Sequence, residues 1–202
     1  MARIAAFIDG FNLYHALDAN PVFHKYKWLD LAKLARCFVK QDDEITSVFY
    51  FTAYATWDPA KVEKHKNYVR ALELEGVKPV FGEFRRKDRR CPKCGKIYPT
   101  FEEKETDVNI AIKLFQTAMA NLYDTALVVS GDSDLIPALE AVKQTFPDKR
   151  IIVVIPIGRR AEALKQTAHA HMKLKEKHLA SCQFDNEIRK GDLVLLRPAS
   201  WK

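Results

Sequence analysis

Glycine is scarce in this chain, with 7 of 202 residues, which leaves little material for a glycine-rich loop that cradles phosphate groups. Long apolar runs are missing as well, since no stretch approaches the roughly 20 residues of a membrane helix. The N-terminal sequence reaches an acid, Asp9, too early for a secretory signal. These absences predict a protein with no membrane partner. They also predict a cytoplasmic location, where the four cysteines stay reduced instead of forming a disulfide framework.

Apolar residues and positive charge are both plentiful. Hydrophobic residues make up 48% of the chain, with 12 Phe, 7 Tyr and 3 Trp, which argues against disorder and suffices for one sizeable core. The net charge of +7 comes from 33 Lys and Arg against 26 Asp and Glu. Residues 85–96 carry +6, residues 159–178 carry +4, and the remainder carries −3. Basic patches on a mildly acidic body indicate an anionic partner.

Short runs rich in Val, Ile and Phe alternate with amphipathic segments along most of the chain. Strands are expected at 3–8, 46–54, 77–84, 125–130 and 150–155, and helices at 29–40, 59–75, 105–121, 134–145 and 160–170. Several of the apolar runs are nearly continuous, as in strands that are covered on both faces. The pattern predicts an α/β three-layer sandwich with a mainly parallel central sheet.

Two segments do not fit this alternation. Residues 85–103 hold the basic run and a Cys-Pro-Lys-Cys-Gly knuckle, which indicates an insertion. Residues 188–202 have the pattern of a turn and a short late strand. We therefore expect one domain over residues 1–157 that contains the insertion. Residues 158–202 would follow as a C-terminal extension, a helix and short strand packed on the same domain, with the 159–178 stretch presenting a solvated basic helix face.

Several acids fall where a parallel sheet binds ligands, at the carboxyl ends of its strands. Asp9 follows the first expected strand, and Asp132 and Asp134 follow the fourth. Asp107 opens the third expected helix, at the end that faces the same rim. Each acid alone has a simpler explanation as a helix cap or a first-turn acid.

The four acids as a set favour a metal site over capping. No Lys or Arg occurs in residues 4–12 or 125–142 to neutralise them. Converging carboxylates without a basic partner repel one another, which raises their pKa values or requires a cation. Oxygen ligands of this kind suit Mg²⁺ or Mn²⁺, which bind substrate phosphates through them.

Three stretches carry a resemblance to a known family. They read Phe7-Ile8-Asp9-Gly10-Phe11-Asn12-Leu13, Glu103-Lys104-Glu105-Thr106-Asp107-Val108 and Val129-Ser130-Gly131-Asp132-Ser133-Asp134-Leu135. In order and spacing the chain resembles, over about residues 3–157, the NYN domains of the PIN-like nuclease superfamily, including the bacterial LabA-like branch. Residues 188–201 also resemble a tail of some bacterial members. The middle stretch departs from the family, which often has Gly before its Thr or Val where this chain has Glu105.

The resemblance implies a metal-dependent ribonuclease that hydrolyses phosphodiester bonds without a covalent nucleophile. Its implied metal-binding acids are Asp9, Asp107, Asp132 and Asp134. The resemblance also implies that Asn12 orients the first motif or contacts a phosphate, and that Ser130 supports Asp132. Bound Mg²⁺ or Mn²⁺ would lower the pKa of a water and neutralise charge on the scissile phosphate.

The basic run is predicted to hold RNA beside the acids, although a charge run of this kind can also be a solvated loop. Its cations are Arg85, Arg86, Lys87, Arg89, Arg90, Lys93 and Lys96. Nearby Phe84, Tyr98 and Phe101 suit stacking on unpaired bases, which favours single-stranded or looped RNA, and they suit an ordinary core equally well.

Cys91 and Cys94 have the spacing of half a structural zinc site. The other half is absent locally, so Zn²⁺ binding and free thiols both stay open, with Cys37, Cys182, a His or a second chain as further ligands. A thioredoxin-like redox pair is disfavoured, because the motif does not open a helix after a strand.

Two other functions compete with the nuclease. The Asp132–Asp134 stretch resembles a late acidic motif of haloacid-dehalogenase phosphatases, but that chemistry needs an acid at position 11, where this chain has Phe11. A non-catalytic RNA-binding or scaffold protein that keeps the fold stays open. A homodimer is also open, although no segment demands one.

Overall fold

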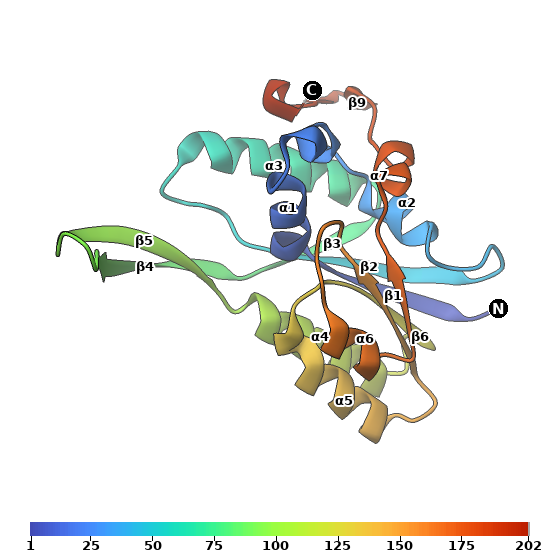
Figure 1. Cartoon of the computed structure of the whole chain (residues 1–202). Helices are drawn as coiled ribbons and strands as arrows, with labels where there is room; N and C mark the ends of the chain where they lie inside the picture. The colour runs from blue at the N-terminus through green and yellow to red at the C-terminus, as the bar shows by residue number, and fades with distance from the viewer. Residues whose placement is uncertain (202) are drawn as a thin grey trace.

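A single parallel sheet organises the chain, as the computed structural model shows for residues 1–201 (Figure 1). The spatial order of its six strands is β3-β2-β1-β6-β7-β8, and every neighbouring pair is parallel. These strands are β1 (Arg3–Asp9), β2 (Glu44–Thr52), β3 (Val77–Phe81), β6 (Thr125–Val129), β7 (Arg150–Ile155) and β8 (Ala170–Lys173). The prediction of an α/β sandwich with a parallel central sheet is confirmed.

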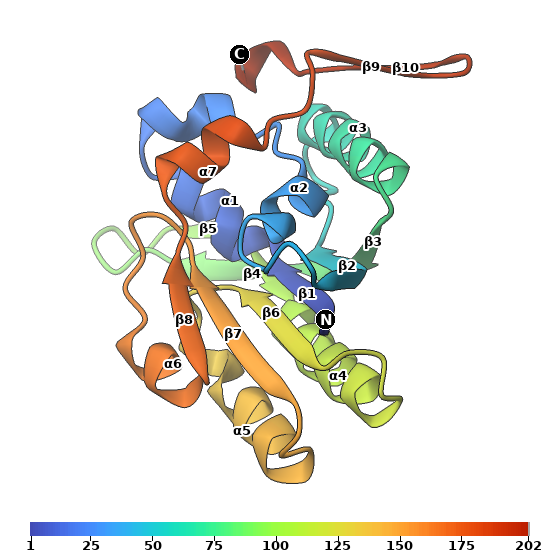
Figure 2. The ribbon, with the colours of Figure 1, turned by 90° about the vertical axis from the view of Figure 1, so that its right-hand side faces the viewer.

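Helices cover both faces of the sheet and complete three layers (Figure 2). One layer holds α1 (Gly10–Asp18), α2 (Leu31–Arg36), α3 (Pro59–Leu74) and α7 (Glu176–Ser181), with the 3₁₀ helix η1 (Pro21–Tyr26) beside α1. The other layer holds α4 (Thr106–Met119), α5 (Ile136–Thr145) and α6 (Glu162–Thr167), with the 3₁₀ turn η2 (Ser133–Leu135) leading into α5. No helix in residues 1–201 combines the length and apolar character needed to cross a bilayer.

The two-residue period of a strand divides the core between these layers. In β1, Ile4, Ala6 and Ile8 belong to the apolar cluster under α1, α2 and α3. The intervening Ala5 and Phe7 belong to the cluster under α4 and α5. Because β1 is buried on both faces, it reads as a continuous apolar run.

The direction of chain progression reverses between β1 and β6. From β1 the sheet continues to β2 and β3 on one side, and from β6 to β7 and β8 on the other. Helices that follow these two strands therefore leave to opposite faces, which opens a crevice at the carboxyl ends of β1 and β6. Asp9 ends β1, and residues 130–134 follow β6.

The expected insertion at 85–103 is an antiparallel hairpin, β4 (Glu83–Arg90) and β5 (Ile97–Lys104), which extends away from the body (Figure 1). The expected strand at 77–84 is wrong at its end, because β3 stops at Phe81 and β4 begins after Gly82. A Cβ at Gly82 would lie 2.5 Å from the Lys104 carbonyl oxygen. Glycine is therefore required where the chain changes from the sheet to the hairpin.

Residues 159–178 do not form the expected helix with a basic face. They contain α6, the sheet strand β8 and the start of α7. The sheet therefore continues beyond the expected domain boundary at residue 157. The sequence patterns also missed α1 and η1, and the expected helix at 29–40 is shortened to α2.

The C-terminal segment is a second hairpin, β9 (Glu187–Lys190) and β10 (Leu193–Leu196), followed by the 3₁₀ turn η3 (Ala199–Trp201) (Figure 2). The hairpin lies against α3, where the Asn67 side chain donates to the Leu196 carbonyl oxygen at 2.7 Å. The Trp201 ring packs against Trp28 and Tyr68. The segment thus packs on the same body, and the last residue of the expected 158–202 extension lies outside the described residues.

The start of the sheet contains an ion pair that links β1 to the loop before β6. Arg3 Nη2 lies 2.7 Å from Asp124 Oδ1, and the Arg3 backbone N–H donates to Asp124 Oδ2 at 2.8 Å. These bonds lower the pKa of Asp124 to about 2, from an ordinary value of 3.8. Ionised Asp124 is therefore favoured in the folded state.

We expect Asp124→Asn to reduce the free energy of unfolding at pH 7, because it removes this ion pair. Since the pKa of Asp124 is depressed in the folded state, its contribution is complete above about pH 4 and is lost as the pH falls through about 2. Urea unfolding between pH 7 and pH 3 should show the gap between wild type and variant shrinking below about pH 4. Asp42→Asn, at an exposed position, is the control. A gap that stays constant to pH 3 would contradict the assignment.

Candidate functional site

Asp9 lies at the bottom of the crevice, where β1 ends and α1 begins. Its side chain caps α1, and Oδ1 accepts a hydrogen bond from the Asn12 backbone N–H at 2.9 Å. Only 3% of the residue is exposed. A buried carboxylate is costly without hydrogen bonds, so its partners decide its orientation.

Ser130 connects Asp9 to the loop that follows β6. Its hydroxyl donates to Asp9 Oδ2 at 2.7 Å and accepts from the Asp132 backbone N–H at 3.0 Å. Asn12 makes a second connection, since its Oδ1 accepts from the Gly131 N–H at 3.0 Å. The first and third sequence motifs are therefore joined by side-chain hydrogen bonds at the crevice.

The other two acids of the third motif lie nearer the surface. Asp132 caps η2, and its Oδ1 accepts from the Asp134 backbone N–H at 3.0 Å. Asp134 is exposed. The capping explanation therefore holds for Asp132 and Asp9, and it leaves the second carboxylate oxygen of Asp132 free of a protein donor in residues 1–201.

Asp107 lies half-buried in the first turn of α4 and faces the same group of acids. Burial is the main cause that raises its pKa to about 6, and the negative charges of Asp132, Asp9, Glu103 and Asp134 raise it further. Burial also raises the pKa of Asp9, against the hydrogen bonds from Asn12 and Ser130 that lower it. The negative charges of neighbouring acids thus contribute to the raised pKa values of Asp9 and Asp107.

Glu103 is an acid of this neighbourhood to which the sequence patterns gave no role. Its charge raises the pKa of both Asp9 and Asp107. Its Oε1 accepts from the Thr106 backbone N–H at 3.0 Å, which satisfies one donor at the start of α4. Its place four residues before Asp107, within the middle motif, was the sequence feature that could have identified it as part of the site.

Glu105 explains the departure from the family's middle motif. It precedes α4 with φ of 77°, in the left-handed region that side chains rarely adopt. Glycine adopts that conformation without strain, which accounts for the Gly that the family often has at this place. Asp107 keeps its position at the start of α4 in spite of the substitution.

The acids do not form a ready-made metal cage. Within residues 1–201, no three His, Cys, Asp or Glu side chains lie close enough together to hold one ion. Asp9, Asp107, Asp132 and Asp134 also form no ion pair with any Lys, Arg or His that the structure describes. Their negative charges share a crevice and stay unpaired.

A cation that the sequence patterns did not place lies at the edge of the crevice. Arg159 follows β7, and its side chain packs against the loop after β6, where a Cβ at Gly131 would lie 3.2 Å from Arg159 Cβ. The same position would be 3.3 Å from Asn12 Oδ1. Glycine at 131 therefore lets the loop after β6, the loop after β7 and the Asn12 side chain of α1 lie close together.

The basic run lies on the β4–β5 hairpin, where acids neutralise much of it. Glu102, on β5, accepts from Arg89 Nη2 at 2.6 Å and lies 3.6 Å from Lys87 Nζ. Arg85 pairs with Glu83 and Glu105, and Arg86 pairs with Asp88. Arg90 donates to the Gly95 carbonyl oxygen. Lys93 and Lys96, near the tip, form no ion pair with a described residue.

Cys91 and Cys94 lie at the tip of the same hairpin, where Gly95 N–H donates to the Cys91 carbonyl oxygen at 2.9 Å. Backbone N–H groups of Cys94 and Lys93 lower the pKa of the Cys91 thiol. Cys37 and Cys182 lie elsewhere, with their Sγ atoms 3.4 Å apart. The described residues thus supply no third and fourth ligand beside Cys91 and Cys94.

The fold and the crevice define a class of protein: a parallel α/β domain with unpaired acids where the strand order reverses. The NYN domain family matches residues 3–175, so the chain belongs to the NYN domain family and has its PIN-like nuclease fold. The resemblance drawn from the three motifs is confirmed, and the match extends past residue 157.

Two relatives and one solved structure are similar to this chain. 6-Hydroxy-3-succinoylpyridine 3-monooxygenase HspA from Pseudomonas putida (strain DSM 28022 / S16) is 28% identical, over 98% of this chain and 75% of that protein. Low amplitude and bright protein LabA from Synechococcus elongatus (strain ATCC 33912 / PCC 7942 / FACHB-805) is 25% identical, over 87% and 85%. A protein of unknown function from Vibrio parahaemolyticus RIMD 2210633 shares the fold, with a TM-score of 0.60, 20% identity, and 87% and 94% coverage. Of these three names the first alone states an activity, so these likenesses establish the family and the fold and do not assign a reaction to this chain.

We expect Ser130→Ala to destabilise the protein by about 1–3 kcal/mol, because it leaves Asp9 Oδ2 and the Asp132 N–H without their partner in a buried place. Urea unfolding at pH 7 measures the change. Ser133→Ala, three residues along and exposed, is the matched control and should be within about 0.5 kcal/mol of wild type. Equal stability of the two variants would show that the Ser130 hydroxyl does not hold the crevice together.

Proposed function

We propose that this chain is a metal-dependent ribonuclease whose active site is the crevice between β1 and β6. One observation carries the proposal: four carboxylates, Asp9, Asp107, Asp132 and Asp134, share the crevice without an ion-pair partner in residues 1–201, and the pKa of Asp107 is raised to about 6. Crowded carboxylates of this kind are stabilised by a cation.

The donor set fits Mg²⁺ or Mn²⁺ better than other ions, because it consists of carboxylate oxygens alone. Mg²⁺ keeps several waters and commonly binds through one or two carboxylates and substrate phosphates, so a cage of three protein ligands is not required. Asp9 and Asp107 would hold the ion, with Asp132 and Asp134 acting directly or through water. When bound, the ion lowers the pKa of a water and neutralises charge on the scissile phosphate.

The chain's own residues orient these acids and receive the phosphate. Ser130 orients Asp9 through its 2.7 Å hydrogen bond. The Asn12 bond to Gly131 supports its role in orienting the first motif, since it aligns the two loops. Arg159, at the edge of the crevice, would give a phosphate oxygen a cationic partner that the acids do not supply.

RNA is the proposed substrate, and the β4–β5 hairpin would bind its strand. NYN nuclease domains commonly bind nucleic acid, which supports an anionic polymer as the partner. Between residues 83 and 104 the hairpin holds eight basic and four acidic side chains, a net charge of +4. Because most hairpin arginines are already paired, Lys93 and Lys96 at the tip are the cations that are free to bind phosphates. Single-stranded or looped RNA is favoured, because the hairpin also carries the exposed aromatic Tyr98.

A second candidate is RNA binding without cleavage. The observation in its favour is that no three potential ligands in the described residues lie close enough to hold an ion. The two candidates differ in their response to EDTA, since binding through the hairpin needs no metal.

We expect Asp9→Asn and Asp107→Asn each to reduce cleavage of RNA by at least about 100-fold, equivalent to about 2.7 kcal/mol of barrier. The assay uses single-stranded and hairpin RNA with Mg²⁺, Mn²⁺ or EDTA. A rise in the melting temperature of wild type with Mn²⁺ should be smaller in both variants, and Asp42→Asn should behave as wild type. Undiminished cleavage by both variants would refute the metal site. RNA binding without cleavage in any metal would favour the second candidate.

We expect the double variant Lys93→Gln/Lys96→Gln to bind single-stranded RNA more weakly at about 0.1 M salt, because each lysine that binds a phosphate releases counterions. The slope of log affinity against log salt should fall by about 0.7 for each phosphate that the variant no longer binds. Fluorescence anisotropy with a labelled oligonucleotide measures both. Lys33→Gln/Lys40→Gln, on and after α2, is the charge-matched control. Equal slopes for the two double variants would exclude the hairpin tip from the RNA interface.

A further inference from the structure

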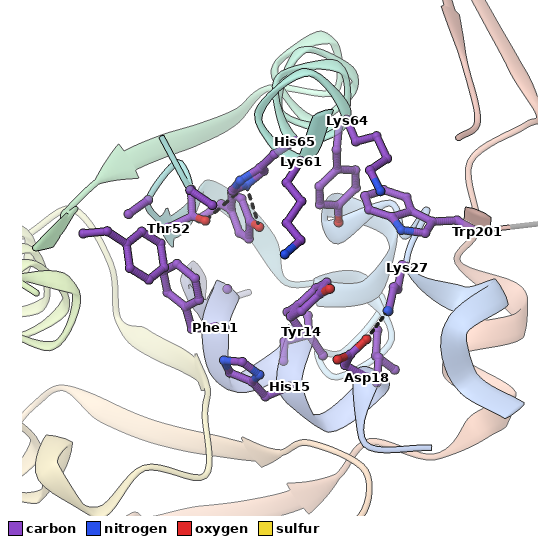
Figure 3. A pocket seen from close by; sticks show the side chains of 18 of the residues that line it. Phe11, Tyr14, His15, Asp18, Lys27, Thr52, Lys61, Lys64, His65 and Trp201 are labelled. Carbon is purple, nitrogen blue, oxygen red and sulfur yellow. Dashed lines mark hydrogen bonds and ion pairs between the residues drawn. The ribbon is translucent and has the colours of Figure 1, made fainter. Parts of the chain in front are cut away.

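A cavity of about 480 Å³ lies beside α1 (Figure 3). Its lining includes Gly10, the residue that follows Asp9. Its walls come from α1, the carboxyl end of β2, α3, the base of the β4–β5 hairpin and the C-terminal Trp201. Cavities of roughly 300–1,000 Å³ hold small molecules and cofactors in proteins. The crevice acids do not line it, so the cavity is a site distinct from the proposed metal site.

Aromatic rings form much of the cavity wall. Phe84 packs edge-on against Phe11 and Trp57, with ring centroids 5.3 Å and 4.7 Å apart. Trp57 also stacks on Phe101, which fixes its ring. At the other end Trp201 packs against Tyr68, at 5.7 Å. Rigid rings that present faces and edges to a cavity suit a planar aromatic ligand.

Positive charge exceeds negative charge among the lining residues. Lys27 is bound to Asp18, and its Nζ also lies 4.7 Å from the Tyr14 ring centroid. Lys61 reaches toward Tyr14 in Figure 3, and its Nζ lies 3.3 Å from Asp58. Lys64 lies beside Trp201 and forms no ion pair or hydrogen bond with a described residue. One ammonium group is therefore free for an anionic ligand.

His65 supplies a polar group at the base of the cavity. Its Nε2 lies 3.2 Å from Thr52 Oγ1 and 3.4 Å from the Tyr50 hydroxyl. Burial lowers its pKa to about 4, so the imidazole is neutral at pH 7. The cavity therefore combines aromatic walls, a neutral polar floor and a free cation, and its charge excess comes from the lysines.

We propose that this cavity binds a planar aromatic ring that carries an anionic group. Two sources have that chemistry: an unpaired nucleotide of an RNA strand, and a free aromatic carboxylate. The ring lies at the Trp201 end of the cavity, beside Trp201 and Tyr68, and the anion is bound by Lys64. The proposal does not depend on metal binding in the crevice.

Adenosine 5′-monophosphate and pyridine-3-carboxylate are the probes, and calorimetry on the full chain at about 0.1 M salt measures their binding. We expect at least one probe to bind, with its neutral analogue, adenosine or pyridine-3-carboxamide, at least about tenfold weaker. Lys64→Gln should weaken the binding of the anionic probe about tenfold. Lys66→Gln, two residues along α3, is the matched control, because Lys66 pairs with Glu63 and does not line the cavity. Circular dichroism confirms that both variants fold.

Competition distinguishes the two sources. Displacement of the bound probe by single-stranded RNA assigns the cavity to a nucleotide, and persistence of the probe assigns it to a free aromatic acid. Absence of binding by both probes at millimolar concentration, or equal affinity of Lys64→Gln and Lys66→Gln, overturns the proposal. Asp9→Asn should leave probe binding unchanged. Loss of cleavage with intact probe binding thus concerns the crevice alone, and cleavage without probe binding refutes the cavity alone.

Discussion

The hydrogen bond between Ser130 and Asp9 is the interaction on which the site depends. It joins the carboxyl ends of β1 and β6, where the sheet reverses its order, across 121 residues of chain. Without that donor the buried carboxylate would keep only the Asn12 backbone N–H to compensate for its lost hydration. The parallel pairing of β1 with β6 places both groups within reach, and the N-terminus of α1 adds favourable backbone charge. The Ser130–Asp9 pair therefore depends on packing, hydrogen bonding and electrostatics together.

Charge is arranged differently at the crevice and on the hairpin. The crevice concentrates acids that have no ion-pair partner in residues 1–201, which is the basis of the metal site that we propose. On the hairpin, Glu102 pairs with Lys87, Arg89 and Lys104, and other acids pair with Arg85 and Arg86, so many cations are already paired. The +6 of residues 85–96 therefore overstates the free charge. In the nuclease that we propose, substrate binding by charge would fall to the hairpin tip, to Arg159 and, in the cavity, to Lys64.

Sequence patterns predicted the elements whose apolar residues repeat regularly. The strands β1, β6 and β7 are buried on both faces and read as apolar runs, and α3 to α5 show helical periodicity. The patterns failed where exposed polar residues form strands. Seven of the eight residues of β4 are charged, and β8 has four residues with alternating burial. Pairing with a neighbouring strand, and not local composition, decides such segments.

The sequence by itself determined the parallel α/β class and the positions of Asp9, Asp107, Asp132 and Asp134 at the rim, because short-range periodicity and strand ends are local properties. Only the tertiary structure decided that Ser130 supports Asp9, that Glu103 and Arg159 join the crevice, and that Glu102 neutralises hairpin cations. The tertiary structure also forms the cavity, which Trp201 completes by packing on residues more than 100 positions away in the sequence. These features depend on contacts between distant segments, which form only when the sheet and its helices have packed.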